Sequence, residues 1–184
     1  MKTILVLVMA LGFTGAAWAQ TGVQSVYTSL KTQDCITVES AMLLPEEERE
    51  IDYYTGVCPS YGGYTVGVSG GDLRYSLYLD YNGTEISLPS YYQFHETGDL
   101  AEWRYTLKST GFHSNELQLK ALIYRIYYSD YDTNGNEVNK SNLIVVRLNK
   151  EKSCVIGVVP QQKDMNLAAR KIADNPKARC VKIN

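Results

Sequence analysis

The clearest pattern in the chain is an alternation of apolar and polar positions over residues 72–80. Its odd-numbered positions carry apolar or aromatic side chains, namely Leu73, Tyr75, Leu77 and Leu79. Its even-numbered positions carry Arg74, Ser76, Tyr78 and Asp80. Because successive side chains of a strand point to opposite faces of the sheet, this period of two predicts a strand with one buried face.

Two Asn-Gly pairs mark tight turns between apolar segments. Asn82-Gly83 follows the alternating segment directly, and Asn134-Gly135 separates an apolar run at residues 122–129 from another at residues 143–148. Asn and Gly tolerate the positive φ angles that two-residue hairpin turns require. We therefore expect an antiparallel hairpin at each pair.

Helical periodicity is clearest in a segment near the C-terminus, and residues 45–50 form a second, weaker candidate for a helix or a loop. Apolar residues of the C-terminal segment fall at i, i+3, i+4 and i+7, namely Met165, Ala168, Ala169 and Ile172. Asp164 is placed to cap the first turn, and Asn175-Pro176 ends the helix.

The remaining strand candidates favour an all-antiparallel arrangement. They cover residues 27–36, 64–68, 103–108, 116–120 and 154–159. The 15 tyrosines of the chain also favour pleated surfaces over helices. We expect a mainly β domain, an antiparallel sandwich or partly closed barrel, with one C-terminal helix packed on it.

The first 19 residues have the pattern of a cleavable signal peptide. Lys2 precedes an apolar run at residues 4–13, and small residues ending in Ala17-Trp18-Ala19 follow it. This run is about half the length that a membrane-spanning helix needs. We expect cleavage after Ala19, which leaves residues 20–184 as a single β-rich domain, periplasmic or secreted, in a bacterium.

Four cysteines in an exported chain suggest two disulfides. Four cysteines allow three pairings, and sequence proximity favours Cys35 with Cys58 and Cys154 with Cys180. Each bond would close a loop of about 25 residues and contribute on the order of 3 kcal/mol on the chain-entropy model. A zinc site is the weaker interpretation, since no two cysteines lie within a few residues of each other.

Charge and hydropathy exclude two classes of partner. The chain carries 18 Lys and Arg against 20 Asp and Glu, and the basic residues form no stripe. Nucleic acid is therefore not an expected partner. Beyond the signal peptide no segment approaches membrane-spanning length, so we expect no membrane insertion.

One serine motif raises the alternative of a hydrolase acting on envelope polymers. Gly67-Val68-Ser69-Gly70-Gly71 matches the G-x-S-x-G pattern of a nucleophile elbow, which needs a strand-to-helix turn. An alternating strand follows it instead. A hydrolase would have to use His95 or His113 with a carboxylate such as Glu96 or Asp99. We identify no catalytic residue on this basis.

A second motif resembles the first half of a calcium loop. Asp130, Asp132 and Asn134 supply oxygen ligands at positions 1, 3 and 5, and a glycine follows. Position 12 is Ser141 instead of glutamate, and the flanking segments look like strands. A calcium ion held by these side chains and the carbonyl of Asn136 is an alternative to an ordinary polar turn, and no other cofactor is expected.

Tyrosines supply the favoured functional hypothesis. Neighbouring residues in a strand point to opposite faces, so one member of each adjacent tyrosine pair is expected outside the core. Tyrosine is favoured in interfaces and on sugar-binding platforms. We expect a non-catalytic binding module that recognises a protein or a glycan of the cell envelope through Tyr91, Tyr92, Tyr127 and Tyr131.

The cysteine and glycine motifs also carry a family resemblance. The chain has Cys35, then Gly56-Val57-Cys58-Pro59, Gly62-Gly63-Tyr64 and Gly71-Asp72-Leu73-Arg74. Over residues 26–80, and less closely in the Cys154 strand and the final helix, it resembles an uncharacterised family of secreted bacterial proteins. This resemblance implies an exported globular domain and transfers no functional residue.

Overall fold

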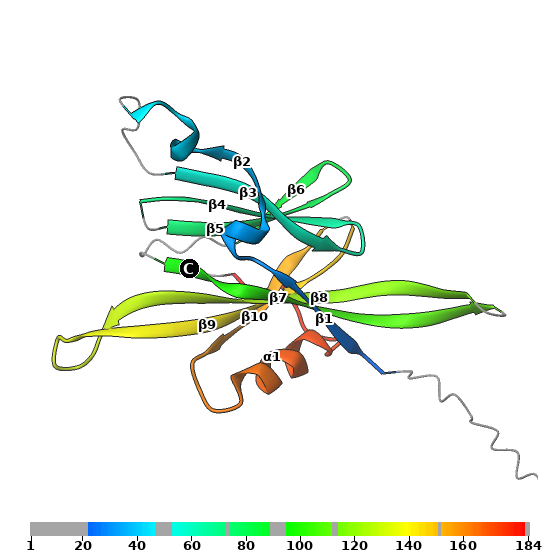
Figure 1. The fold of residues 1–184 in the computed structure, drawn as a ribbon. Helices are drawn as coiled ribbons and strands as arrows, with labels where there is room; N and C mark the ends of the chain where they lie inside the picture. The colour runs from blue at the N-terminus through cyan, green and yellow to red at the C-terminus, as the bar shows by residue number, and fades with distance from the viewer. Residues whose placement is uncertain are drawn as a thin grey trace, which may run out of the picture.

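The computed structural model describes residues 22–46, 53–72, 74–88, 95–111, 114–150 and 152–182. Its strands are β1 (Gln24–Ser29), β2 (Ile36–Ser40), β3 (Tyr53–Tyr61), β4 (Tyr64–Gly71), β5 (Arg74–Tyr81), β6 (Thr84–Ser87), β7 (His95–Gly111), β8 (Ser114–Tyr131), β9 (Glu137–Arg147) and β10 (Cys154–Pro160) (Figure 1). Two short 3-10 helices, η1 (Thr32–Asp34) and η2 (Ala41–Leu43), flank β2, and the helix α1 (Met165–Ala173) follows β10.

The strands form one sheet that folds into two layers. Its order is β10-β9-β8-β7-β5-β4-β3-β2, with β1 added on β7 and β6 on β5. Neighbouring strands pair antiparallel, except that β5 and β7 meet in parallel at the single pair Arg74 and His95. Figure 1 shows β2–β6 above this junction and β7–β10 below it. The sheet does not close into a barrel.

The main core lies between these two layers. Val66 and Leu79 from the upper layer and Trp103, Leu122 and Ile144 from the lower layer belong to one buried cluster. The predicted sandwich with one C-terminal helix is therefore confirmed.

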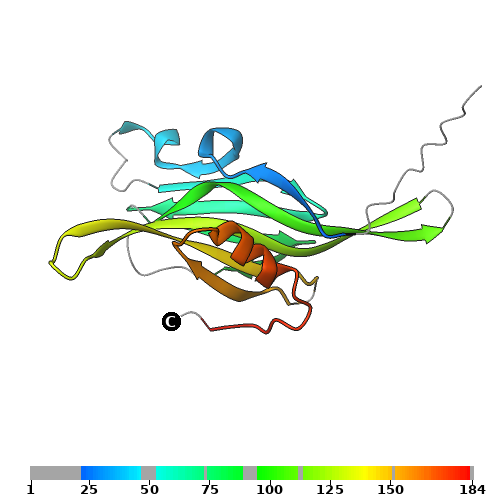
Figure 2. The same ribbon diagram turned by 90° about the horizontal axis from the view of Figure 1, so that it is seen from below.

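Helix α1 covers the outer face of the lower layer (Figure 2). Met165 and Ala169 pack there against Ala121, Leu143 and Val145. The central parts of β8 and β9 are thus buried on both faces, which explains why residues 143–146 are all apolar, without alternation.

Both Asn-Gly hairpins are confirmed. Asn82 and Gly83 take φ angles of 52° and 79° between β5 and β6, and Gly135 takes 80° between β8 and β9. The helix is confirmed from Met165 onward. The capping prediction is wrong: Asp164 has φ 61° and its side chain makes no capping hydrogen bond.

The single strand predicted over residues 27–36 is also wrong. The chain leaves β1 at Ser29, buries Leu30 at 2% exposure, and passes through η1 before β2 begins. Strand β1 pairs with β7 of the lower layer, whereas β2 pairs with β3 of the upper layer. The polar turn at η1 is therefore where the chain crosses between layers.

Both favoured disulfide pairings are confirmed. Cys35 bonds to Cys58, which links the start of β2 to β3, and Cys154 bonds to Cys180, which links β10 to the segment after α1. The described cysteines therefore leave no thiolate for zinc. None of the helices in the described ranges has the length and apolar character needed to cross a bilayer.

Candidate functional site

A cleft of about 260 Å³ lies between α1 and the lower layer of the sheet. Strand β1 contributes Tyr27, β7 contributes Leu100, β8 contributes Arg125 and Tyr127, and α1 contributes Asn166. Leu143 of β9 also lines the cleft, so β1, the consecutive strands β7–β9 and α1 together build it. Its residues combine aromatic, aliphatic and charged side chains.

An irregularity in β7 makes room for the cleft. The register between β7 and β8 shifts between Thr97 and Ala101. Gly98 lies in this interval, and a Cβ atom at that position would stand 2.8 Å from the Cβ of Arg125. A larger residue would therefore push Arg125 out of place, so the glycine fixes the close approach of the two strands.

Arg125 lies partly buried against α1 without a carboxylate. Its Nη1 donates to the Ser141 hydroxyl over 2.9 Å and approaches the Met165 sulfur at 3.0 Å, and its Nη2 is 3.5 Å from the Asn166 carbonyl oxygen. The guanidinium carbon stands 5.9 Å from the centre of the Tyr127 ring. Among the described residues, Arg125 forms no ion pair.

The other charges beside the cleft are paired. The Glu102 carboxylate accepts from Nε and Nη2 of Arg170 at 2.7 and 3.2 Å, and it also accepts from the Ser25 hydroxyl. Arg170 donates in turn to the Tyr27 hydroxyl over 2.6 Å. The hydrogen bond with Glu102 raises the pKa of the Arg170 guanidinium above its ordinary value. This network joins α1 to β1 and β7.

A second pair extends the network. Arg104 donates to the Asp174 carboxylate from Nε at 2.9 Å and from Nη2 at 2.5 Å, and its Nη1 lies 3.6 Å from Glu102. The side chains of Glu102 and Arg104 are each 9% exposed. Charges this buried are held only because each has a counter-charge.

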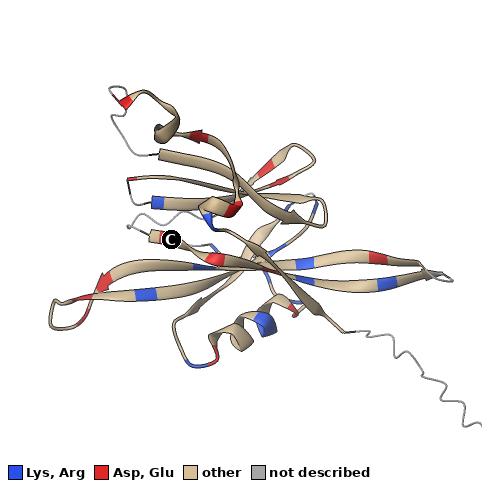
Figure 3. Cartoon of the chain, in the orientation of Figure 1, with Lys and Arg blue, Asp and Glu red and all other residues tan. Residues whose placement is uncertain are grey.

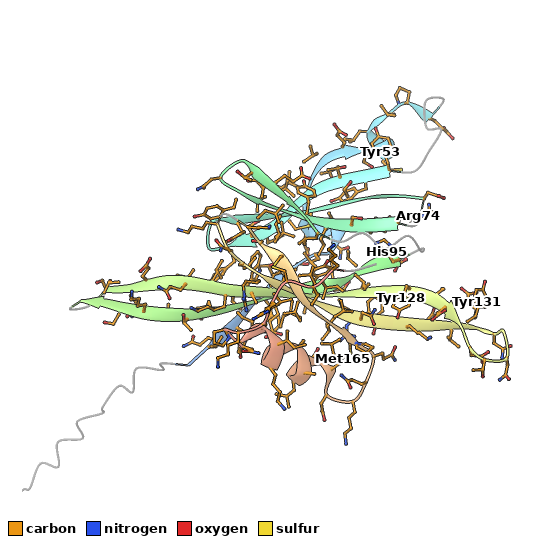
Figure 4. All side chains as sticks on the ribbon, turned by 180° about the vertical axis from the view of Figure 1, so that it is seen from behind. Tyr53, Arg74, His95, Tyr128, Tyr131 and Met165 are labelled. Atoms are coloured by element: carbon orange, nitrogen blue, oxygen red, sulfur yellow. A yellow bond between two sulfur atoms is a disulfide. The ribbon has the colours of Figure 1, made fainter. Side chains whose placement is uncertain are left out.

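The structure describes two of the four predicted binding tyrosines, and these two lie apart on β8. Tyr127 lines the cleft and is 47% exposed. Tyr131 is 69% exposed and stands toward the far end of the β8–β9 hairpin, away from Met165 and α1 (Figure 4). Tyr91 and Tyr92 lie outside the described residues. Only Tyr127 of the four is therefore placed at the cleft.

Sequence reasoning named only Tyr127 and Asp99 among the residues that line this cleft, and it missed Tyr27 and Arg125 among others. A charged residue inside the apolar run of residues 122–129 is a signal that could have marked Arg125. No local signal marks Tyr27, because β1 reaches the cleft through its pairing with β7.

Of the residues proposed for a hydrolase, Glu96 and Asp99 line a second cleft together, but His95 does not line it. His95 is buried at the junction with β5, beside Arg74 (Figure 4), and it does not line the cleft beside α1 either. Glu96 is exposed, and Asp99 lies 3.7 Å from Lys31. His113 lies outside the described residues.

Ser69 does not occupy a nucleophile elbow. It sits within β4, between Thr55 of β3 and Ser76 of β5. The neighbouring Gly67 is packed under the ring of Tyr78, whose Cζ would lie 1.8 Å from an added Cβ. The glycine therefore allows close packing of Tyr78 against β4.

The oxygens of the proposed calcium loop are hydrogen-bonded within the hairpin. Asp130 pairs with Lys140 at 2.6 Å, and Asp132 accepts from the backbone N–H groups of Asn134 and Asn136. In the part of the chain that the structure describes, no three His, Cys, Asp or Glu side chains gather as a metal site. Calcium binding by Asp130, Asp132, Asn134 and Asn136 stays a prediction, and the ion would have to displace Lys140.

The Asp130 carboxyl is expected to resist protonation. The hydrogen bond from Lys140, with that from the Tyr131 N–H, holds its pKa below the ordinary value. A carboxyl with a lowered pKa in the folded state stabilises the fold at neutral pH, and this contribution is lost as the pH falls through the lowered pKa. An NMR titration of Asp130 should show a higher pKa in Lys140→Met and no change in Lys171→Met. An unchanged pKa in Lys140→Met would contradict the pairing.

Exposed apolar side chains gather at a second place, the outer edge of the upper layer. Ile36 and Val38 of β2 and Met42 and Leu43 of η2 are all more than half exposed. Strand β2 ends the sheet order, so its outer edge carries no partner strand among the described residues. Charged residues of both signs are scattered over both layers, with no basic stripe (Figure 3).

Comparison with other proteins identifies no relative of this chain. Neither the known protein families, nor the curated proteins, nor the solved structures contain a match to this chain. The resemblance of residues 26–80 to secreted bacterial proteins therefore stays a prediction, and the functional conclusion depends on the chemistry of the cleft itself.

Proposed function

We propose that the chain is a non-catalytic binding domain of the bacterial cell envelope and that it recognises a protein or a glycan at the cleft between α1 and β8. The observation that supports this most is the pair of half-exposed rings, Tyr27 and Tyr127, beside the exposed Leu100. Tyrosine rings offer flat apolar contact together with a polar tip, which suits both kinds of partner.

The disulfides support export. Disulfides form and persist in oxidising compartments, and this chain has two. Residues 1–19 would direct the chain out of the cytoplasm as a signal peptide. Both the periplasm and the extracellular space provide the oxidising conditions that the two bonds need.

The state of the carboxylates favours binding over hydrolysis. Both oxygens of Glu102 accept hydrogen bonds from Arg170, so this group is occupied by a cation rather than positioned to take a proton. The described residues that line the cleft include no histidine, serine or cysteine. A nucleophile with a neighbouring base is the arrangement that hydrolysis by covalent catalysis requires.

Tyr127→Ser is expected to weaken partner binding by at least about tenfold, the factor that corresponds to about 1.4 kcal/mol. The substitution removes a ring at the rim of the cleft without opening the core. The chain, as residues 20–184, is immobilised and exposed to an envelope extract, and the component that it retains is purified. A titration then measures the affinity of this component for each variant. Tyr131→Ser is the matched control, because Tyr131 lies on the same strand outside the cleft.

Two results would contradict this assignment. Equal affinity of Tyr127→Ser and the native chain would exclude the cleft. Hydrolysis of the retained component by the native chain would exclude a non-catalytic role.

The β2 edge supports a second candidate, a protein partner that adds a strand to the sheet. Ile36 is 75% exposed and Met42 is 70% exposed, and natural sheets seldom leave such edges uncovered. If Ile36→Asp abolishes binding of the retained component and Tyr127→Ser does not, this edge is the recognition surface instead of the cleft.

A further inference from the structure

We infer that the ligand of this cleft is an acidic sugar residue whose carboxylate binds Arg125. The inference rests on the proposed function and names the ligand class for the same site. It starts from the contrast between Arg125 and two other arginines at this interface, Arg104 and Arg170. A further arginine, Arg147, donates to the backbone carbonyls of Asn175 and Ala178 after the helix. Arg104 and Arg170 each have a carboxylate partner, whereas Arg125 has a hydroxyl, a thioether and a distant amide oxygen.

The partly buried guanidinium of Arg125 has only neutral partners and therefore lacks a counter-charge. Removing a charge from water is costly unless a counter-charge replaces the lost hydration. Thioether sulfur is a weak acceptor, and the amide contact at 3.5 Å is at the limit of hydrogen bonding. An anionic ligand would complete the coordination of Arg125.

The guanidinium is also held in place before a ligand arrives. Ser141, which is 5% exposed, anchors Nη1, and the close approach of Gly98 fixes the stem of the side chain. The described contacts leave Nε without a partner and Nη2 with a weak one. These two nitrogens form the fork that binds both oxygens of a carboxylate, and fixing the donors beforehand reduces the entropy lost on binding.

Charge balance favours a single negative charge on the ligand. Asp99 and Glu102 line the same cleft. Glu102 is neutralised by Arg170, and Asp99 is only loosely paired with Lys31 at 3.7 Å. A dianionic phosphate would meet one unpaired cation and a nearby carboxylate, so a monoanion fits better.

The rest of the lining suits a sugar ring. The Tyr127 ring and Leu100 offer apolar contact, while Asn166, Asp99 and the Tyr27 hydroxyl can bond to ring hydroxyls. A volume of about 260 Å³ lies at the small end for ligand pockets, which limits the occupant to about one ring. A peptide carboxylate would bind Arg125 in the same way but offers fewer hydroxyls to these polar groups than a sugar ring does.

The experiment is an NMR titration of the full mature chain, residues 20–184, with sodium glucuronate. Glucose is the neutral control of the same ring size, and N-acetylalanine is the carboxylate without a sugar ring. We expect glucuronate to shift the amide signals of Gly98 and Leu100 and to bind at least tenfold more tightly than either control. Arg125→Met should weaken glucuronate binding at least tenfold, Arg125→Lys should restore part of it, and Arg74→Met should leave it unchanged.

Each other outcome overturns a defined part of the inference. Equal affinity for glucose and glucuronate, or unchanged affinity in a folded Arg125→Met, excludes the carboxylate. N-acetylalanine binding as tightly as glucuronate excludes the sugar and indicates a peptide carboxylate. If no probe shifts the cleft signals while Tyr127→Ser still loses the retained component, the acidic sugar is excluded and the proposed binding function stands.

Discussion

Replacing Glu102 with alanine is expected to lower the free energy of unfolding by about 3 to 5 kcal/mol, the cost of removing one partner from a buried ion pair. Its carboxylate is the group that Arg170, Ser25 and Arg104 all approach. Without it, Arg104 and Arg170 would share only the charge of Asp174. Urea denaturation of the oxidised chain measures the loss.

Asp99→Ala is the matched control for Glu102→Ala. Asp99 lies on the same strand, but its side chain is 71% exposed and its pairing with Lys31 is loose. Exposed pairs contribute about 0 to 1 kcal/mol, so this variant should unfold almost as the native chain does. If the two variants lost similar stability, the buried network would not be what holds α1 to the sheet. The double variant Glu102→Leu with Arg170→Met should recover part of the loss, because it removes both charges.

Trp103→Ala should cost about 3 to 5 kcal/mol through the cavity that it leaves. Trp103 is fully buried, and its ring centre lies 6.4 Å from those of Tyr61 and Tyr64 in the opposite layer. Its Nε1 also donates to the Thr28 hydroxyl over 2.8 Å. The loss therefore combines packing between the layers with one hydrogen bond to β1.

Thermal and urea unfolding of Trp103→Phe and Tyr131→Ala provide the comparison. The phenylalanine keeps a ring in the core and should lose less than alanine, whereas Tyr131→Ala removes an exposed ring and should lose little. A small loss in Trp103→Ala would contradict a core built between the two layers.

Turns and the helix α1 could be predicted from the sequence, because the residues within each of these segments determine its backbone conformation. Asn82-Gly83 and Asn134-Gly135 predicted turns because Asn and Gly adopt positive φ angles more readily than most residues, and Asn82, Gly83 and Gly135 have such angles. The helical spacing of residues 165–172 predicted α1 because the apolar face that it describes is the one buried. The prediction that Asp164 caps α1 failed because its backbone is left-handed and its side chain makes no capping hydrogen bond.

The cleft could not be predicted because distant segments build it. The hydrogen bond between Arg170 and Tyr27 joins residues 143 positions apart. Tyr127 was predicted from the abundance of tyrosine. The positions of the cleft residues of β1 and β7 depend instead on the crossing of β1 between the layers and on the irregularity in β7. The crossing of β1 has no local sequence signal, because it results from how the two layers pack. The irregularity in β7 has one in Gly98, since an isolated glycine inside a strand indicates a bulge.

The positions of the disulfides have a mechanical consequence. Each bond bridges a stretch of the chain, with sequence separations of 23 and 26 residues. An extended chain measures roughly 3.4 Å per residue, so each disulfide encloses a segment about 80 to 90 Å long. A pulling force applied outside the two loops could not extend these segments. The second loop contains α1 with most of β10, so tension on an oxidised chain would leave that segment slack while the rest straightens. The oxidised chain, held at its ends, would thus be extensible to a shorter length than its number of residues implies.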